Sequence, residues 1–276
     1  MDRRPIGIFD SGLGGLTAAR TLEQILPGET MVYFGDSINA PYGTRSRAEL
    51  LSLATANTEF LLGFDVKAIL IACGTVSSNV LDALAQRFPD VPFFGVLDAA
   101  CRSAAAASRT GRIAVTATEA TIRSGAFGAR LRALRPDADV FSKPCQSLVE
   151  TVEQGHFGGD DPVAAAAVAQ ELAPVRAYRP DTLLLACTHF PLLEREIADY
   201  MGAEVQLLSV AEETAKALRD YLCAEGRCTD AQQGAHRWFT SGGTEEFARY
   251  AALFLGHEIV PEYHRNRPNG PEGGTI

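Results

Sequence analysis

The chain has 276 residues, of which 46% are hydrophobic and 21% are charged, and its formal net charge is −9. This length predicts about two domains, and the composition supports an ordinary globular core. An acidic chain without a Lys/Arg cluster cannot release counterions from a phosphate backbone, so we expect small-molecule ligands and no nucleic acid. No signal-peptide segment opens the chain and no apolar run reaches the ~20 residues of a membrane helix, so we expect a cytoplasmic protein with no membrane partner.

Strand and helix patterns alternate over the first hundred residues. Apolar runs predict four strands, at 6–9, 31–34, 66–72 and 92–96. Helical spacing predicts three helices, over 16–26, 47–62 and 79–87. Each predicted strand is apolar on both faces, which is typical of a parallel sheet that helices cover on both sides.

The same order of elements recurs in the next hundred residues. Four further strands are predicted, at 113–116, 140–141, 182–186 and 205–208. The first of these leads into a hydroxyl-rich loop at 117–121, and the second leads through 143–145 into a helix. The third ends at Cys187, as the strand at 66–72 ends at Cys73. A duplicated fold explains this recurrence, with two parallel-sheet α/β domains related by a pseudo-twofold axis.

The segment after the repeat is too short for a third domain. It predicts helices over 211–222 and 245–255, with a short edge strand at 238–241 between them. We expect this segment to complete the first domain. The predicted domains are therefore residues 1–97 plus 209–264 and residues 98–208, and residues 265–276, rich in Gly, Pro and Asn, predict a disordered tail.

Open parallel sheets bind ligands beyond the carboxyl ends of their strands. The residues at those ends supply two thiols, two candidate bases and many hydroxyl or amide donors: Asp10, Ser11, residues 36–43, Cys73, Gly74, Thr75, Thr118, Thr121, Cys187, Thr188 and His189. If a pseudo-twofold axis relates the halves, Cys73 and Cys187 approach one site from opposite sides. Inversion of a stereocentre by proton transfer requires an acid and a base on opposite faces of one carbon. The two thiols are the candidate pair.

Each thiol needs a neighbour to become a useful thiolate, because a free cysteine has a pKa of roughly 8.5. Asp10 and His189 are the candidate helpers, one beside each thiol, and Glu153 is a candidate second contact of His189. Other interpretations stay open: Asp10 could cap the following helix, His189 could be a hydrogen-bonded structural histidine, and either cysteine could be a small buried apolar residue.

Cofactors have weaker support in the sequence. The glycine-rich loop puts Thr17 where GxGxxG needs a third small residue, although Asp36 lies at a suitable spacing for a ribose contact. Pyridoxal phosphate needs a lysine, and only Lys143 of the three lysines lies near a strand end. The six cysteines lack the spacing of a zinc site. We therefore expect neither cofactor nor metal.

Four separated motifs, IGIFDSGLGGLT, YFGDSINAPYGTRS, AILIACGTVSS and LLLACTHFPLL, together resemble the cofactor-independent glutamate racemases of the aspartate/glutamate racemase superfamily. The resemblance implies two flavodoxin-like domains with the active site in the cleft between them, and a supply of D-glutamate for peptidoglycan and the cell wall. It matches Cys73 and Cys187 to the catalytic thiols, with Asp10 and His189 assisting. The substrate-binding positions that it implies are Asp10, Ser11, Pro41, Tyr42, Gly43, Gly74, Thr75, Thr118, Thr121, Thr188 and His189.

One departure from this family concerns the substrate. The first cysteine motif usually reads Cys-Asn-Thr, and here it reads Cys73-Gly74-Thr75. The missing amide would contact the substrate amino group, and loss of such a charge-assisted hydrogen bond costs roughly 1.5–3 kcal/mol. A related isomerase for another amino acid or carboxylate, and a non-catalytic relative, therefore stay open beside glutamate racemisation. The oligomeric state is open as well, with a homodimer among the alternatives.

Overall fold

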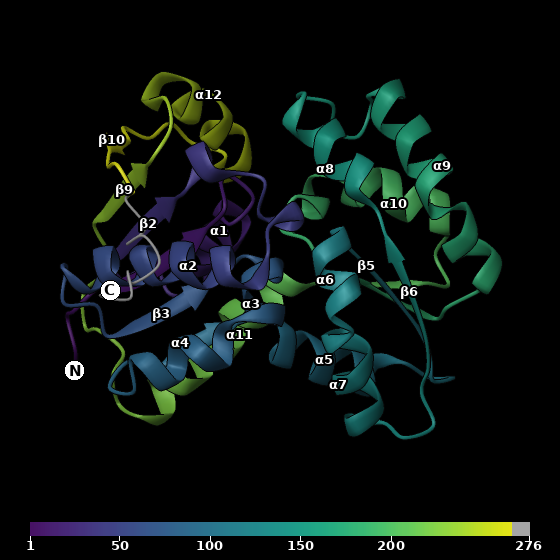
Figure 1. The fold of residues 1–276 in the computed structure, drawn as a ribbon, viewed down its shortest axis with the longest axis horizontal. Coiled ribbons are helices and arrows are strands. Elements are labelled where there is room, and N and C mark those ends of the chain that lie inside the picture. The colour runs from purple at the N-terminus through teal and green to yellow at the C-terminus, as the bar shows by residue number, and fades with distance from the viewer. Residues whose placement is uncertain (267–276) are drawn as a thin grey trace, which may run out of the picture.

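The computed structural model describes residues 1–266 and arranges them around two separate sheets (Figure 1). The first sheet has six strands in the order β10-β9-β2-β1-β3-β4, and the second has four strands in the order β6-β5-β7-β8. Every strand pair in both sheets is parallel. The predicted α/β class with two parallel sheets is confirmed.

The strands of the first sheet are β1 (Ile6–Asp10), β2 (Met31–Gly35), β3 (Ala68–Ile71), β4 (Phe93–Gly95), β9 (His236–Thr240) and β10 (Glu262–Tyr263). Those of the second are β5 (Arg112–Ala117), β6 (Asp139–Pro144), β7 (Thr182–Leu185) and β8 (Gln206–Ser209). The α-helices are α1 (Leu16–Ile25), α2 (Arg47–Leu62), α3 (Gly74–Asn79), α4 (Leu81–Arg87), α5 (Val96–Ala107), α6 (Glu119–Ser124), α7 (Ala126–Leu134), α8 (Gln146–Glu153), α9 (Pro162–Tyr178), α10 (Glu194–Met201), α11 (Val210–Ala224) and α12 (Thr244–Leu255). Short 3-10 helices are η1 (Ser37–Asn39), η2 (Tyr42–Thr44) and η3 (Phe190–Leu193).

The two sheets share one strand order. In the first, β2, β1, β3 and β4 are consecutive neighbours, and in the second β6, β5, β7 and β8 take the same places. β1 and β5 are therefore equivalent, as are β3 and β7. The duplication predicted from the order of strands and polar loops is confirmed, and it brings the ends of β3 and β7 to equivalent positions.

Alternating side chains of the central strands pack on helices at both faces of each sheet. Ile6 and Ile8 of β1 belong to the core formed with α1, α11 and α12, whereas Phe9 packs in the core that contains α2. In the second sheet, Ile113 and Val115 pack with α5 and α7, and Ala114 faces the core of α8 and α9. Burial of each large apolar side chain contributes about 1.5–3 kcal/mol, so both sheets are anchored on both faces.

Several element predictions need correction. The strand predicted at the edge, 238–241, is β9, which lies inside the sheet between β2 and β10. The helix predicted over 79–87 is divided, because Asn79 ends α3 and α4 begins at Leu81. Residues predicted as loops also belong to regular elements: Lys143 and Pro144 extend β6, and Thr121 lies in α6.

The chain after α12 returns to the first sheet as β10 and reaches Asn266, which is buried. The remainder of the predicted tail, residues 267–276, lies outside the described residues. The predicted domain boundaries stay a prediction. Within residues 1–266, no helix combines the length and apolar character needed to cross a membrane.

Candidate active site

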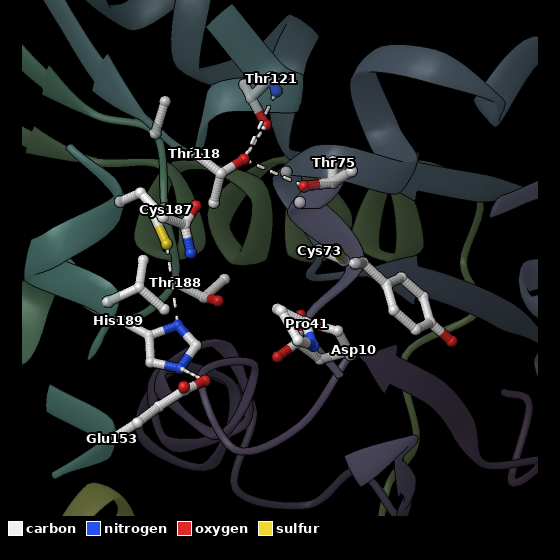
Figure 2. Close-up of a pocket in the computed structure, with 17 residues that line it drawn as sticks. Asp10, Pro41, Cys73, Thr75, Thr118, Thr121, Glu153, Cys187, Thr188 and His189 are labelled. Carbon is white, nitrogen blue, oxygen red and sulfur yellow. Dashed lines mark hydrogen bonds and ion pairs between the residues drawn. The ribbon is translucent and has the colours of Figure 1, made fainter. Parts of the chain in front are cut away.

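One pocket gathers the candidate site residues at the carboxyl ends of strands from both sheets (Figure 2). Its lining consists of Asp10, Ser11, Pro41, Tyr42, Gly43, Cys73, Gly74, Thr75, Thr118, Thr121, Gln146, Val149, Glu153, Ala186, Cys187, Thr188 and His189. The site residues predicted from the sequence lie on this wall, except residues 36–40 of the predicted segment 36–43. Gln146, Val149 and Ala186 were not predicted. The cavity volume is about 30 Å³, which is room for about two water molecules.

The two candidate thiols enter the pocket from equivalent strands. Cys73 follows β3 and immediately precedes α3, and Cys187 follows β7. Both are buried, with 5% and 6% of their surface exposed. Figure 2 places them on opposite sides of the pocket. The two cysteines therefore reach the pocket from opposite sides, which is the arrangement that the duplicated sequence pattern predicts.

His189 links the Cys187 thiol to a carboxylate. Its Nδ1 lies 3.7 Å from Cys187 Sγ, and its Nε2 lies 3.5 Å from Glu153 Oε1 (Figure 2). Burial disfavours the imidazolium, but the hydrogen bonds with Cys187 and Glu153 outweigh it and raise the pKa of His189 to about 10. The ring is therefore cationic at neutral pH. Cys187 therefore has a protonatable ring beside its sulfur, which makes it the candidate base of the pair.

Cys73 lies in the opposite electrostatic environment. Burial, followed by the charge of Asp10, raises the pKa of Cys73 to about 12. This thiol is therefore protonated at neutral pH and is placed to act as an acid. Burial also raises the pKa of Asp10, against the opposing effects of His189 and nearby backbone amides.

Asp10 has one carboxylate oxygen bonded to the start of a helix and the other without a partner in the described residues. Its Oδ2 accepts hydrogen bonds from the backbone N–H groups of Gly12 (3.3 Å) and Gly15 (2.9 Å), and Gly15 directly precedes α1. The carboxylate therefore supports the start of that helix. Its Oδ1 is buried and has no hydrogen-bond partner within residues 1–266. An unpartnered buried carboxylate oxygen in a pocket is available to a cationic ligand group.

Three threonine hydroxyls form a connected chain across the two halves of the pocket. Thr75 Oγ1 lies 3.1 Å from Thr118 Oγ1, and the Thr118 hydroxyl donates to Thr121 Oγ1 at 3.0 Å (Figure 2). Thr118 also caps α6, since its Oγ1 accepts from the Thr121 backbone N–H at 3.4 Å. The cap fixes both hydroxyls on the second half against Thr75 on the first. Hydroxyls grouped in this way can donate hydrogen bonds to a carboxylate.

The sequence model of the Asp/Glu/Hydantoin racemase family matches residues 16–218. The chain belongs to this family. A glutamate racemase from Geobacter metallireducens is 38% identical over 264 residues, covering 95% of this chain and 97% of that protein. A glutamate racemase isoform from Bacillus anthracis has a solved structure that aligns with a TM-score of 0.91 at 36% identity, over 96% of this chain and 98% of that one.

A second solved structure is the glutamate racemase from Francisella tularensis in complex with D-glutamate. It aligns with a TM-score of 0.86 at 31% identity, over 96% of this chain and 97% of that one. The resemblance drawn from the four sequence motifs is confirmed, and so is the two-sheet fold that it implies. The chain is an isomerase of the amino-acid racemase type.

In this racemase the side chain of Asp36 is committed to a structural network. It is fully buried and accepts hydrogen bonds from Asn39 (2.9 and 3.0 Å), the Tyr42 hydroxyl (2.6 Å), Ser241 (2.7 Å) and Asn266 (3.0 Å). Because these donors already bond to both oxygens of the Asp36 carboxylate, it is not available to accept hydrogen bonds from the ribose hydroxyls of a dinucleotide. The network instead ties Tyr42, which lines the pocket, to the end of β9 and to the C-terminal segment.

Other cofactor and metal ligands are not assembled at the pocket. Lys143 Nζ bonds to Glu171 (2.8 Å) and to the Pro144 carbonyl (2.7 Å), and Lys143 does not line the pocket. Across the described part of the chain, no group of three or more His, Cys, Asp or Glu side chains is arranged to hold a metal ion. The groups present at the pocket itself are those of proton transfer and hydrogen bonding.

Gly74 marks a close backbone approach between the two halves of the racemase. A Cβ on this residue would lie 2.8 Å from the backbone carbonyl oxygen of Ala186, at the end of the opposite sheet. Backbone stands on both sides of that contact, so neither partner can move aside cheaply. The backbone of Ala186 therefore leaves no room for an asparagine side chain at position 74 in this structure.

We expect Gly74→Ala to lower the free energy of unfolding by about 1–3 kcal/mol, because the added methyl overpacks this contact. Urea unfolding measures the change. The control is Gly128→Ala inside α7, where the new Cβ would meet only the flexible end of Arg132 at 3.2 Å. That control should raise stability by up to about 1 kcal/mol through helix propensity. Equal effects of the two substitutions would contradict the close approach.

Proposed function

We propose that this racemase interconverts L-glutamate and D-glutamate without a cofactor, with Cys73 and Cys187 as the acid and base on opposite faces of the α-carbon. The observation that carries the proposal is the arrival of two buried thiols at one pocket from the equivalent strands β3 and β7. The relatives named above as glutamate racemases, and the neighbouring structure with D-glutamate, support glutamate as the substrate.

In one direction, the Cys187 thiolate beside the His189 cation removes the α-proton, and the protonated Cys73 delivers a proton to the opposite face. The sulfurs then hold the reverse protonation states. In the other direction Cys73 must be the base, and Asp10 is the group placed to take up its proton, since burial raises the pKa of that carboxyl. General acid–base catalysis of this kind contributes about 10²–10⁴-fold to a rate.

The polar lining has separate tasks for the substrate's charged groups. Asp10 Oδ1, buried and unpartnered within residues 1–266, is our candidate acceptor for the substrate ammonium. The hydroxyl chain of Thr75, Thr118 and Thr121 is the candidate carboxylate site. Negative charge develops on the substrate when its α-proton leaves, and donors fixed at the carboxylate stabilise that charge. We also assign substrate contacts to Ser11, Pro41, Tyr42, Gly43, Gly74, Thr188 and His189.

The cavity volume of about 30 Å³ is smaller than an amino acid needs, and we propose that the pocket widens to admit the substrate. Closure afterwards excludes water, which strengthens the electrostatic interactions inside the pocket. We propose that the D-glutamate formed supplies peptidoglycan synthesis in the cytoplasm and so contributes to cell-wall biogenesis and cell shape.

The direct test incubates the purified chain with each enantiomer of glutamate and of aspartate, and follows the opposite enantiomer by chiral chromatography. Both glutamate enantiomers should approach a 1:1 mixture, and aspartate should turn over far more slowly. The alternative substrate is aspartate or another carboxylic acid. The observation that favours it is Gly74, which stands where the family usually has an asparagine amide. Fast turnover of aspartate with inert glutamate would replace the proposal by that alternative.

A further inference from the structure

Gln146 brings an uncommitted carboxamide into the pocket. It is the first residue of α8 and lines the same wall as the threonine hydroxyls. Its Oε1 is buried and has no hydrogen-bond partner within residues 1–266. The described protein therefore does not hold this carboxamide in one orientation through its oxygen, and a ligand group at the pocket wall can meet either its oxygen or its NH₂.

The surroundings of Gln146 show which substrate group it would meet. A Cβ built on Gly43 would lie 3.3 Å from Gln146 Oε1 and 3.3 Å from Thr118 Cβ, so these three residues meet at one corner of the pocket. Thr118 belongs to the hydroxyl chain that we assign to a carboxylate. A carboxamide carries a donor NH₂ and an acceptor oxygen on one rotatable group, so it can turn its NH₂ toward a carboxylate at this corner.

Position 74 supplies no side-chain amide to the pocket. The approach of Ala186 excludes a side chain at position 74, so α3 brings no amide into the pocket. Gln146 reaches the pocket from the other sheet, at the start of the helix that follows β6. Gln146 thus supplies a side-chain amide to the pocket, whereas the first cysteine motif, with Gly74, supplies none.

We propose that Gln146 is a specificity-determining residue of this racemase, and that its side-chain NH₂ donates a hydrogen bond to a carboxylate of the dicarboxylic amino acid. This inference rests on the proposed function. The ammonium goes to Asp10, whose unpartnered oxygen carries the charge that a cation prefers, and the corner of Gly43, Thr118 and Gln146 takes a carboxylate.

The test compares Gln146→Met and Gln146→Glu in steady-state racemisation of glutamate at neutral pH. Methionine keeps the length of the side chain without its hydrogen bond, so KM should rise about tenfold or more while kcat stays within about threefold. Glutamate at this position accepts but cannot donate, and its charge repels a carboxylate, so its KM should rise further. The control is Gln154→Met, an exposed residue just beyond the other end of α8, which should leave both constants unchanged.

Two results would overturn the inference while the wild-type chain racemises glutamate normally. One is an unchanged KM in Gln146→Met. The other is a KM in Gln146→Glu at or below the wild-type value, which would mean that the side chain accepts a bond from the ammonium instead. A wild-type chain that leaves glutamate unchanged overturns the proposed function itself, and the inference with it. Circular dichroism of each variant checks that the fold is kept.

Discussion

Replacement of Cys73 or Cys187 by serine is expected to lower kcat for glutamate racemisation by about 10³-fold or more in each single variant. A serine hydroxyl is a much weaker acid than a thiol, so it neither forms the base nor delivers the proton at a useful rate. Each sulfur acts in both directions, once as acid and once as base. Both directions should therefore fail together, which chiral chromatography from each enantiomer measures.

The matched control for the thiol variants is Cys223→Ser. Cys223 is an exposed cysteine near the end of α11 and does not line the pocket. Its replacement should leave kcat unchanged, which separates a general effect of removing a thiol from a catalytic one. Substantial activity in either Cys73→Ser or Cys187→Ser would contradict the assignment of the pair.

Replacement of His189 by asparagine is the second change with a large expected effect, a loss of about 10²–10⁴ in kcat/KM. The ring nitrogen that lies 3.7 Å from the Cys187 sulfur would be gone. Because the two enantiomers have equal free energy, the equilibrium constant is one, and kcat/KM must fall equally in both directions. Unequal losses would indicate an error in the assay rather than in the chemistry.

The pH dependence gives this prediction a sign. The pKa of His189 is raised to about 10, so the ring is cationic below that pH and neutral above it. Wild-type kcat, measured at saturating glutamate so that titration of the free substrate does not enter, should therefore decline as pH rises through about 10, and His189→Asn should lack this decline. The control is His257→Asn, since His257 is an exposed residue that pairs with Glu23 at 3.0 Å outside the pocket. A wild-type profile that is flat through pH 10 would contradict the role of the cation.

The sequence predicts the pocket well because its two halves repeat. Cys73 and Cys187 each follow a buried strand, and polar residues follow the other strand ends. Parallel strands bring such ends to one edge of a sheet, so these residues could be grouped before any coordinates were known. The interior position of β9 could not be predicted from the sequence, because its outer neighbour β10 is only two residues long and shows no strand periodicity.

What the sequence does not reveal are contacts between distant segments. Asp36 is held by Ser241 and Asn266, which lie 205 and 230 residues away along the chain. The tight approach of Ala186 to Gly74 likewise depends on how the two sheets meet. Gln146 follows a strand end, a signal that could have identified it, but its unpartnered oxygen becomes visible only once the pocket is assembled.

The most direct test of the two-thiol account is the fate of the α-proton in deuterium oxide at early conversion. If one sulfur removes the proton and the other delivers a second one from the opposite side, newly formed D-glutamate should carry deuterium at its α-carbon, and the remaining L-glutamate should keep protium. The same pattern should hold when the reaction starts from D-glutamate. Product that retains the α-proton of its own substrate would show that a single group moves the proton between faces, and would contradict the account.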